Sequence, residues 1–216
     1  MGSGMAETGF LDRVTNGRRW QVYVPYDFKP GYPAILFLHG MGESGTEGVK
    51  QSAIGISMGI RMDRSRWPFL VVLPQKPTHE EPWTDSRPHI DKVLEAVEKE
   101  FDTDPHRRYI TGLSQGGFGT FELAAHLRWN FAAAAPVCGW RSSEGIEKDF
   151  KDIPIWAFHG EDDPVVPAQR SKDAIEKIKA SGGDAQLTLL PGVQHNSWDH
   201  AYQKSDLPNW LLSHNL

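Results

Sequence analysis

The chain of 216 residues contains a single cysteine, Cys138. It can therefore form no internal disulfide and no zinc site built on several cysteine ligands. It also lacks any run that approaches the ~18 apolar residues of a membrane-spanning helix. Positive charge is not in excess, because 23 Lys and Arg stand against 28 Asp and Glu, a net charge of −5. This balance disfavours nucleic acid and anionic membrane surfaces as partners.

The remaining composition is that of one globular domain. Hydrophobic residues make up 39% of the chain, and 21 glycines bring the apolar share close to that of ordinary globular proteins. Residues 1–5 are interpreted as an expression scar before a second initiator-like Met, and residues 6–216 as a single domain. No signal peptide is evident, which does not establish a cytoplasmic protein. We expect a soluble protein; secretion after removal of a signal peptide and the oligomeric state stay open.

Short apolar runs alternate with helical patterns along the chain. The runs predict strands at 20–24, 34–38, 69–73, 108–111, 132–135, 155–158 and 186–190, with a weaker strand near 10–15. Apolar residues spaced three to four apart predict helices at 90–101, 118–127, 168–180 and 200–213, whereas 40–66 and 74–88 are predicted to be long loops. The alternation predicts an α/β fold with about eight mostly parallel strands covered by helices on both faces.

The strongest local motif is the segment Gly112-Leu113-Ser114-Gln115-Gly116, between a predicted strand and a predicted helix. G-x-S-x-G in this setting is typical of a nucleophile elbow, a tight turn that presents the serine hydroxyl at a helix N-terminus. The flanking glycines fit because such a turn has no room for larger side chains. Ser114 is therefore the candidate nucleophile, in preference to an ordinary turn residue.

A serine nucleophile needs a base and an acid that orients the base, and in this fold they follow in the order serine, acid, histidine. Asp163 follows the strand predicted at 155–158, and His195 follows the last predicted strand. Asp162 is an alternative acid, and His200 is an alternative base at the start of a predicted helix. We favour Asp163 and His195. His39 and His159 also end strands, where structural hydrogen bonds are the expected role.

A glycine-rich turn follows the strand predicted at 34–38. We expect the backbone N–H groups of Met41 and Gln115 to form an oxyanion hole. The stretch 40–45 also matches G-x-G-x-x-G, the fingerprint of dinucleotide sites. That interpretation needs an immediate helix and an acid at the end of the next strand, whereas this strand ends in Pro74-Gln75 and Asp63 lies in an Arg-rich stretch. A dinucleotide site is therefore disfavoured.

The sequence is rich in tryptophan, with eight in all. Trp83, Trp140 and Trp198 fall in or near predicted loops, and they either belong to the core or line an aromatic or acyl pocket. Trp83 and Trp140 are the candidates for substrate binding. His195 and His200 are not spaced as a helical zinc pair, and we expect no metal and no cofactor.

Five segments, LHGMGE, VVLPQ, GLSQGGFGT, FHGEDDPVVP and QHNSWD, resemble those of α/β-hydrolase serine carboxylesterases. More narrowly, the chain is similar to the small group of feruloyl esterases and polyhydroxybutyrate depolymerase-like proteins. The resemblance implies an α/β-hydrolase catalytic domain without a large lid. It also implies Ser114, Asp163 and His195 as the triad and an oxyanion turn at Gly40-Met41. Gln75 and Trp83 resemble family positions near the mouth of the site, so Gly40, Gln75 and Trp83 are candidate substrate contacts.

The sequence thus predicts a serine carboxylesterase that hydrolyses short-chain acyl or aryl esters through an acyl-enzyme. A feruloyl-type esterase, an acyltransferase or a small peptidase could use the same triad, and a non-catalytic binding module is a remote alternative. The expected partner is a small-molecule ester. His195 must be neutral to accept a proton, so we expect activity to fall below about pH 6–7.

Overall fold

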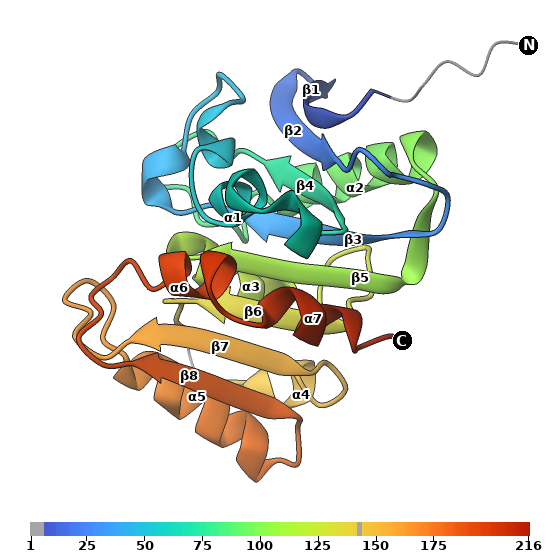
Figure 1. The fold of residues 1–216 in the computed structure, drawn as a ribbon. Helices are drawn as coiled ribbons and strands as arrows, with labels where there is room; N and C mark the ends of the chain where they lie inside the picture. Colours follow the sequence, from blue (N-terminus) through green and yellow to red (C-terminus); the bar gives the residue numbers. More distant parts are fainter. Residues whose placement is uncertain (1–6, 142–143) are drawn as a thin grey trace, which may run out of the picture.

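The computed structural model describes residues 7–141 and 144–216, and the interpreted expression scar lies outside them. The sheet has eight strands in the order β1-β2-β4-β3-β5-β6-β7-β8 (Figure 1). The strands are β1 (Gly9–Thr15), β2 (Arg18–Val24), β3 (Tyr32–Leu38), β4 (Leu70–Pro74), β5 (Thr103–Leu113), β6 (Ala133–Val137), β7 (Ile155–Gly160) and β8 (Ala185–Leu190). β1 and β2 are antiparallel to their neighbours, and all other neighbouring pairs are parallel, which confirms the predicted fold class.

Helices cover both faces of the sheet (Figure 1). One face packs against α2 (Arg87–Glu100), α3 (Gln115–Leu123), α4 (Ile146–Asp149) and α5 (Gln169–Ala180). The other packs against α1 (Ile56–Met62), α6 (Trp198–Gln203) and α7 (Leu207–Leu212). Every residue of β3 is buried between these layers, which explains why its sequence is continuously apolar instead of alternating.

Three helical regions differ from the sequence prediction, and one of them is the short α4, which lies outside every predicted helix. α1 lies inside the predicted loop 40–66, and its close packing depends on Gly59, where an added Cβ would lie 2.4 Å from the Tyr202 carbonyl oxygen. Periodicity of large apolar residues does not report a contact made through glycine. The helix predicted at 200–213 is two helices, and Pro208 stands in the first turn of the second, where its missing N–H costs nothing.

His39, directly after β3, is a fully buried structural histidine, as the sequence predicts. Its Nδ1 donates to the Gly40 carbonyl oxygen at 2.6 Å, and its Nε2 accepts from the Lys76 N–H at 3.1 Å. Burial, chiefly, lowers the pKa of His39 to about 3. A protonated Nε2 could not accept the Lys76 N–H, so the turn after β3 is built around a neutral imidazole.

This environment predicts acid-sensitive stability. The pKa of His39 is depressed on folding, so its contribution is present above about pH 6.5 and is lost as pH falls towards 3, because the unfolded chain binds the proton more readily. Between pH 7 and pH 5 the loss from this one group should be about 2 kcal/mol of unfolding free energy. In urea titrations at both pH values, His39→Gln should show a smaller pH dependence than the parent. Equal dependence would contradict the assignment.

Candidate active site

Ser114 occupies a sharp turn between β5 and α3. Its φ of 54° lies in the left-handed region, which is rare for a residue with a side chain, and its N–H donates to the Val137 carbonyl oxygen at 2.9 Å. The strained backbone is held by this bond and by the two elements that join at Ser114. The hydroxyl therefore stands at the carboxyl end of the central strands, where α/β sheets form their sites.

The glycines on both sides of Ser114 are required by close approach. A Cβ at Gly112 would lie 2.4 Å from the Gly116 carbonyl oxygen, and a Cβ at Gly116 would lie 1.8 Å from the Leu38 carbonyl oxygen. Both distances are far inside van der Waals contact. The prediction that this turn excludes larger neighbours is confirmed, and it ties the elbow directly to the end of β3.

Asp163 and His195 reach Ser114 from the loops after β7 and β8. The Ser114 hydroxyl lies 2.9 Å from Nε2 of His195, and Nδ1 of His195 lies 2.7 Å from Oδ2 of Asp163. A carboxylate only accepts hydrogen bonds, so Nδ1 carries the proton and Nε2 accepts from the serine. The structure does not bring the alternatives here: Asp162 is exposed in the loop, and His200 lies within α6.

The Asp163 side chain is fully enclosed and has a partner for each oxygen. Oδ1 accepts the N–H groups of Val165 and Val166 at 2.8 and 2.9 Å. Burial by itself raises the pKa of Asp163, but the hydrogen bonds from His195, Val166 and Val165 outweigh it, and the pKa lies below its ordinary value. The group is therefore held as a carboxylate facing the imidazole.

A second buried imidazole contacts the same carboxylate. Nε2 of His159 lies 3.2 Å from Oδ2 of Asp163 and 2.9 Å from the Val166 carbonyl oxygen, and Nδ1 lies 2.7 Å from the Ser171 hydroxyl. Burial lowers the pKa of His159, which favours the neutral ring. The predicted structural hydrogen bonds of His159 are confirmed. The contact between His159 and Asp163 was not predicted. The position of His159 four residues before Asp163, in the segment FHGEDD, could have indicated it.

The two residues predicted to form the oxyanion hole begin two helices. Met41 is the first residue of the 3-10 helix Met41–Glu43, and Gln115 is the first residue of α3. A helix offers no carbonyl to its first N–H, and neither group donates to the backbone of another element within the described residues. Both donors therefore remain available, and their role stays a prediction. No α-helix follows at once after Gly40, as a dinucleotide site would need, because α1 starts only at Ile56.

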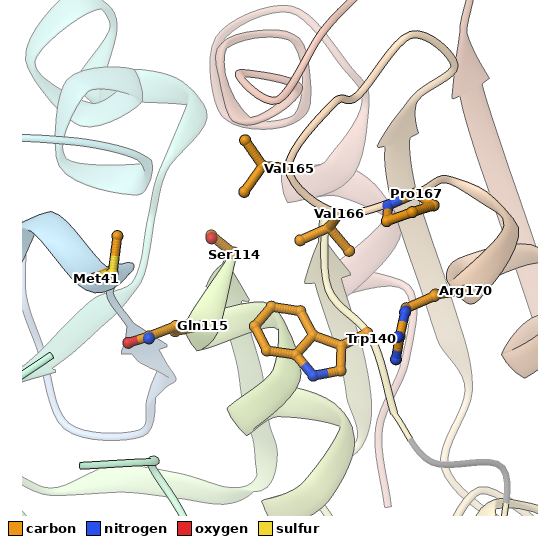
Figure 2. A pocket seen from close by; sticks show the side chains of 8 residues that line it. All are labelled: Met41, Ser114, Gln115, Trp140, Val165, Val166, Pro167 and Arg170. Carbon is orange, nitrogen blue, oxygen red and sulfur yellow. The ribbon is translucent and has the colours of Figure 1, made fainter. Parts of the chain in front are cut away.

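A cavity of about 310 Å³ opens beside Ser114 (Figure 2). Its lining residues are Met41, Ser114, Gln115, Trp140, Val165, Val166, Pro167 and Arg170. Met41 and Gln115 lie on one side of Ser114, and Trp140, Val166 and Arg170 on the other (Figure 2). The Trp140 ring stacks on Phe118 with centroids 5.2 Å apart. Trp140 thus lines the cavity beside the nucleophile, while its contact with a substrate stays a prediction.

Three other candidate substrate contacts do not line this cavity. Trp83 is fully buried, and its Nε1 donates to the His39 carbonyl oxygen at 3.0 Å. Trp83 therefore stabilises the turn that follows β3. Gln75 is buried and bridges the 43–48 loop through the Glu43 carbonyl oxygen and the Gly48 N–H. Gly40 packs closely on Leu113, since an added Cβ at Gly40 would lie 2.9 Å from the Leu113 Cδ1. In the structure all three shape the loop that carries Met41, and their contact with a substrate stays a prediction.

Two further findings concern metal binding and membrane spanning. Within residues 7–141 and 144–216 no group of three or more His, Cys, Asp or Glu side chains is arranged to hold a metal ion. In the same part of the chain no helix is long and apolar enough to span a membrane.

The sheet order, the elbow after β5 and the loops after β7 and β8 define an α/β-hydrolase fold. Residues 24–206 match the phospholipase/carboxylesterase family. The chain belongs to this family.

The chain is also similar to individual proteins. The chain is 28% identical over 170 residues to the bifunctional acetylxylan esterase/xylanase XynS20E of Neocallimastix patriciarum, covering 76% of this chain and 24% of that protein. It is 26% identical to a probable feruloyl esterase C of Aspergillus niger, covering 85% and 69%. A thermostable esterase of known structure superposes with a TM-score of 0.83 at 30% identity, covering 96% and 63%. The chain thus spans only about a quarter of the first of these relatives.

Proposed function

We propose that this protein is a serine carboxylesterase that hydrolyses short-chain acyl or aryl esters. The observation that carries the proposal is the hydrogen-bonded series from the Ser114 hydroxyl through His195 to Asp163, with distances of 2.9 and 2.7 Å, beside an open cavity. The family and the esterase relatives support the same reaction class. The substrate is a small-molecule ester.

In the proposed reaction Ser114 Oγ attacks the ester carbonyl carbon while Nε2 of His195 takes the hydroxyl proton. The resulting oxyanion accepts hydrogen bonds from the N–H groups of Met41 and Gln115. His195 then gives its proton to the departing alkoxide, which leaves the acyl group on Ser114. Water, deprotonated by His195, attacks the acyl-enzyme. His195 then returns this proton to Ser114 Oγ as the bond to the acyl group breaks, which releases the acid and restores the enzyme. Asp163 keeps the proton on Nδ1 and stabilises the imidazolium at each stage.

An aryl ester of the feruloyl type is the second candidate substrate. Trp140, stacked on Phe118, presents a flat aromatic wall to the cavity, a surface suited to a planar ring. The likeness to a probable feruloyl esterase C supports this option. Acyl transfer and amide hydrolysis need the same triad, and no feature of the cavity favours either.

The cavity volume predicts the acyl preference. About 310 Å³ is at the lower end of small-molecule sites, so para-nitrophenyl acetate, butyrate and hexanoate should fit, whereas a decanoate chain should not be enclosed. Because the cavity is open, the methylenes beyond hexanoate should remain in solvent, and we expect kcat/KM to gain less than about twofold from hexanoate to decanoate. Rates across this series, with methyl ferulate and a para-nitroanilide alongside, test the proposal. No hydrolysis of any ester would contradict it, and faster amide cleavage would indicate a peptidase.

A further inference from the structure

Arg170 places a cation in the wall of the proposed catalytic cavity. It lies in the first turn of α5, seven residues after Asp163, and lines the same cavity as Ser114. Figure 2 shows Arg170, like Trp140, on the opposite side of Ser114 from Met41. Nothing in the proposed ester chemistry requires a positive charge at this position.

Among the residues that the structure describes, no acidic side chain neutralises the charge of Arg170. In the part of the chain that the structure describes, its guanidinium has neither an ion pair nor a hydrogen bond, whereas nearby Arg141 pairs with Asp149 and Glu122. No Asp or Glu lines the cavity, and the exposed Glu161 and Asp162 of the neighbouring loop are outside its lining. A chain with a net charge of −5 thus turns an unpaired cation towards its substrate cavity.

The other residues that line the cavity limit which ligands can bind the Arg170 guanidinium. Val165, Val166 and Pro167 form an apolar strip between Ser114 and Arg170, and Trp140 adds a flat aromatic face (Figure 2). A ligand that fills this space needs an apolar or planar body with an anionic group at its far end. Guanidinium binds carboxylate through paired N–H donors, which makes a carboxylate the matching group.

We propose that Arg170 is a specificity-determining residue that selects esters bearing a carboxylate in addition to the scissile bond. This inference rests on the proposed esterase function and names its substrate class. Arg170 acts on substrate binding and takes no part in proton transfer. Because the residue is exposed, salt screens the interaction, and its effect should weaken as ionic strength rises.

Matched ester pairs test the proposal. The para-nitrophenyl half-ester of adipic acid carries an anion in the acyl part, and para-nitrophenyl hexanoate is its neutral partner. Para-acetoxybenzoate carries the anion in the alcohol part, with para-acetoxybenzamide as its neutral partner. The kcat/KM ratio of anionic to neutral ester is measured in the parent, Arg170→Gln and Arg170→Lys. Arg64→Gln, which removes an exposed arginine stacked on Tyr26 and outside this cavity, is the matched control.

We expect Arg170→Gln to lower the anionic-to-neutral ratio about tenfold for at least one pair, mainly through KM, while the neutral esters change less than about twofold. Arg170→Lys should keep part of the ratio, Arg64→Gln should keep all of it, and added salt should reduce it in the parent. The responding pair identifies which part of the ester carries the anion. Unchanged ratios for both pairs, or equal loss on anionic and neutral esters, would overturn the proposal. Hydrolysis of the neutral esters separately tests the esterase function itself.

Discussion

Replacing Ser114 with alanine is expected to lower kcat for para-nitrophenyl butyrate by about four orders of magnitude or more. The variant lacks the oxygen that forms the acyl-enzyme, while His195, Asp163 and both oxyanion donors remain in place. Without a nucleophile these groups can only assist direct attack by water. Initial rates of the purified parent and Ser114→Ala, measured side by side, give the ratio.

The alanine variant should fold normally, because it keeps a Cβ at the same left-handed backbone position and removes only one partly buried hydrogen bond. Ser181→Ala, at the end of α5 and outside the cavity, is a control that should retain parent activity. If Ser114→Ala kept more than about one hundredth of the parent rate, the loss would be too small for removal of a nucleophile, and another residue would have to be acylated.

Asp163→Asn is expected to lower kcat by about 10⁴-fold. The asparagine oxygen can still accept the N–H groups of Val165 and Val166, which leaves its NH₂ facing Nδ1 of His195. His195 must then accept at Nδ1 and carry its proton on Nε2, pointing at Ser114, where it cannot act as a base. The same NH₂ opposes Nε2 of His159, so a second imidazole is placed in conflict.

The adjacent residue provides a matched control for this prediction. Asp162→Asn makes the same chemical change on an exposed side chain, and its activity should stay within about twofold of the parent. Circular dichroism and unfolding temperature distinguish a folded inactive Asp163→Asn from an unfolded one. If Asp162→Asn instead lost activity and Asp163→Asn retained it, the assignment of the acid would be reversed.

The sequence predicts the sheet well because buried parallel strands have a simple signature. The runs at 34–38 and 69–73 are apolar on both faces, and each ends at a turn signal. α1 escapes prediction because its packing uses Gly59. The break between α6 and α7 lies at the polar residues Lys204, Ser205 and Asp206, which the prediction passed over because apolar residues stand on both sides of them. The first error concerns a contact between helices, which local spacing does not report, whereas the second concerns a polar break that the sequence does contain.

The residues of the candidate site also differ in how well the sequence predicts them. Ser114, Asp163 and His195 are marked by local motifs after strands, and strands that run parallel bring such motifs to one edge of the sheet. Trp83 and Gln75 are also close to that edge in sequence, yet their side chains are buried and bind backbone groups of the loop after β3. Arg170 has no motif of its own and is found only through the cavity that it lines. The sequence shows how close a residue is to the end of a strand. The direction of its side chain depends on packing against segments that are distant in the sequence.

The central claim, that Ser114 is the nucleophile of a working triad, is tested most directly with a fluorophosphonate. Ser114 Oγ would attack phosphorus and displace fluoride, with the hydroxyl proton passing to His195. Mass spectrometry of the intact parent protein should show one added phosphonyl group, and the digest should place it on Ser114. Ser114→Ala should not be labelled, and His195→Ala should be labelled far more slowly. An unlabelled parent, or a label on a different residue, would contradict the claim.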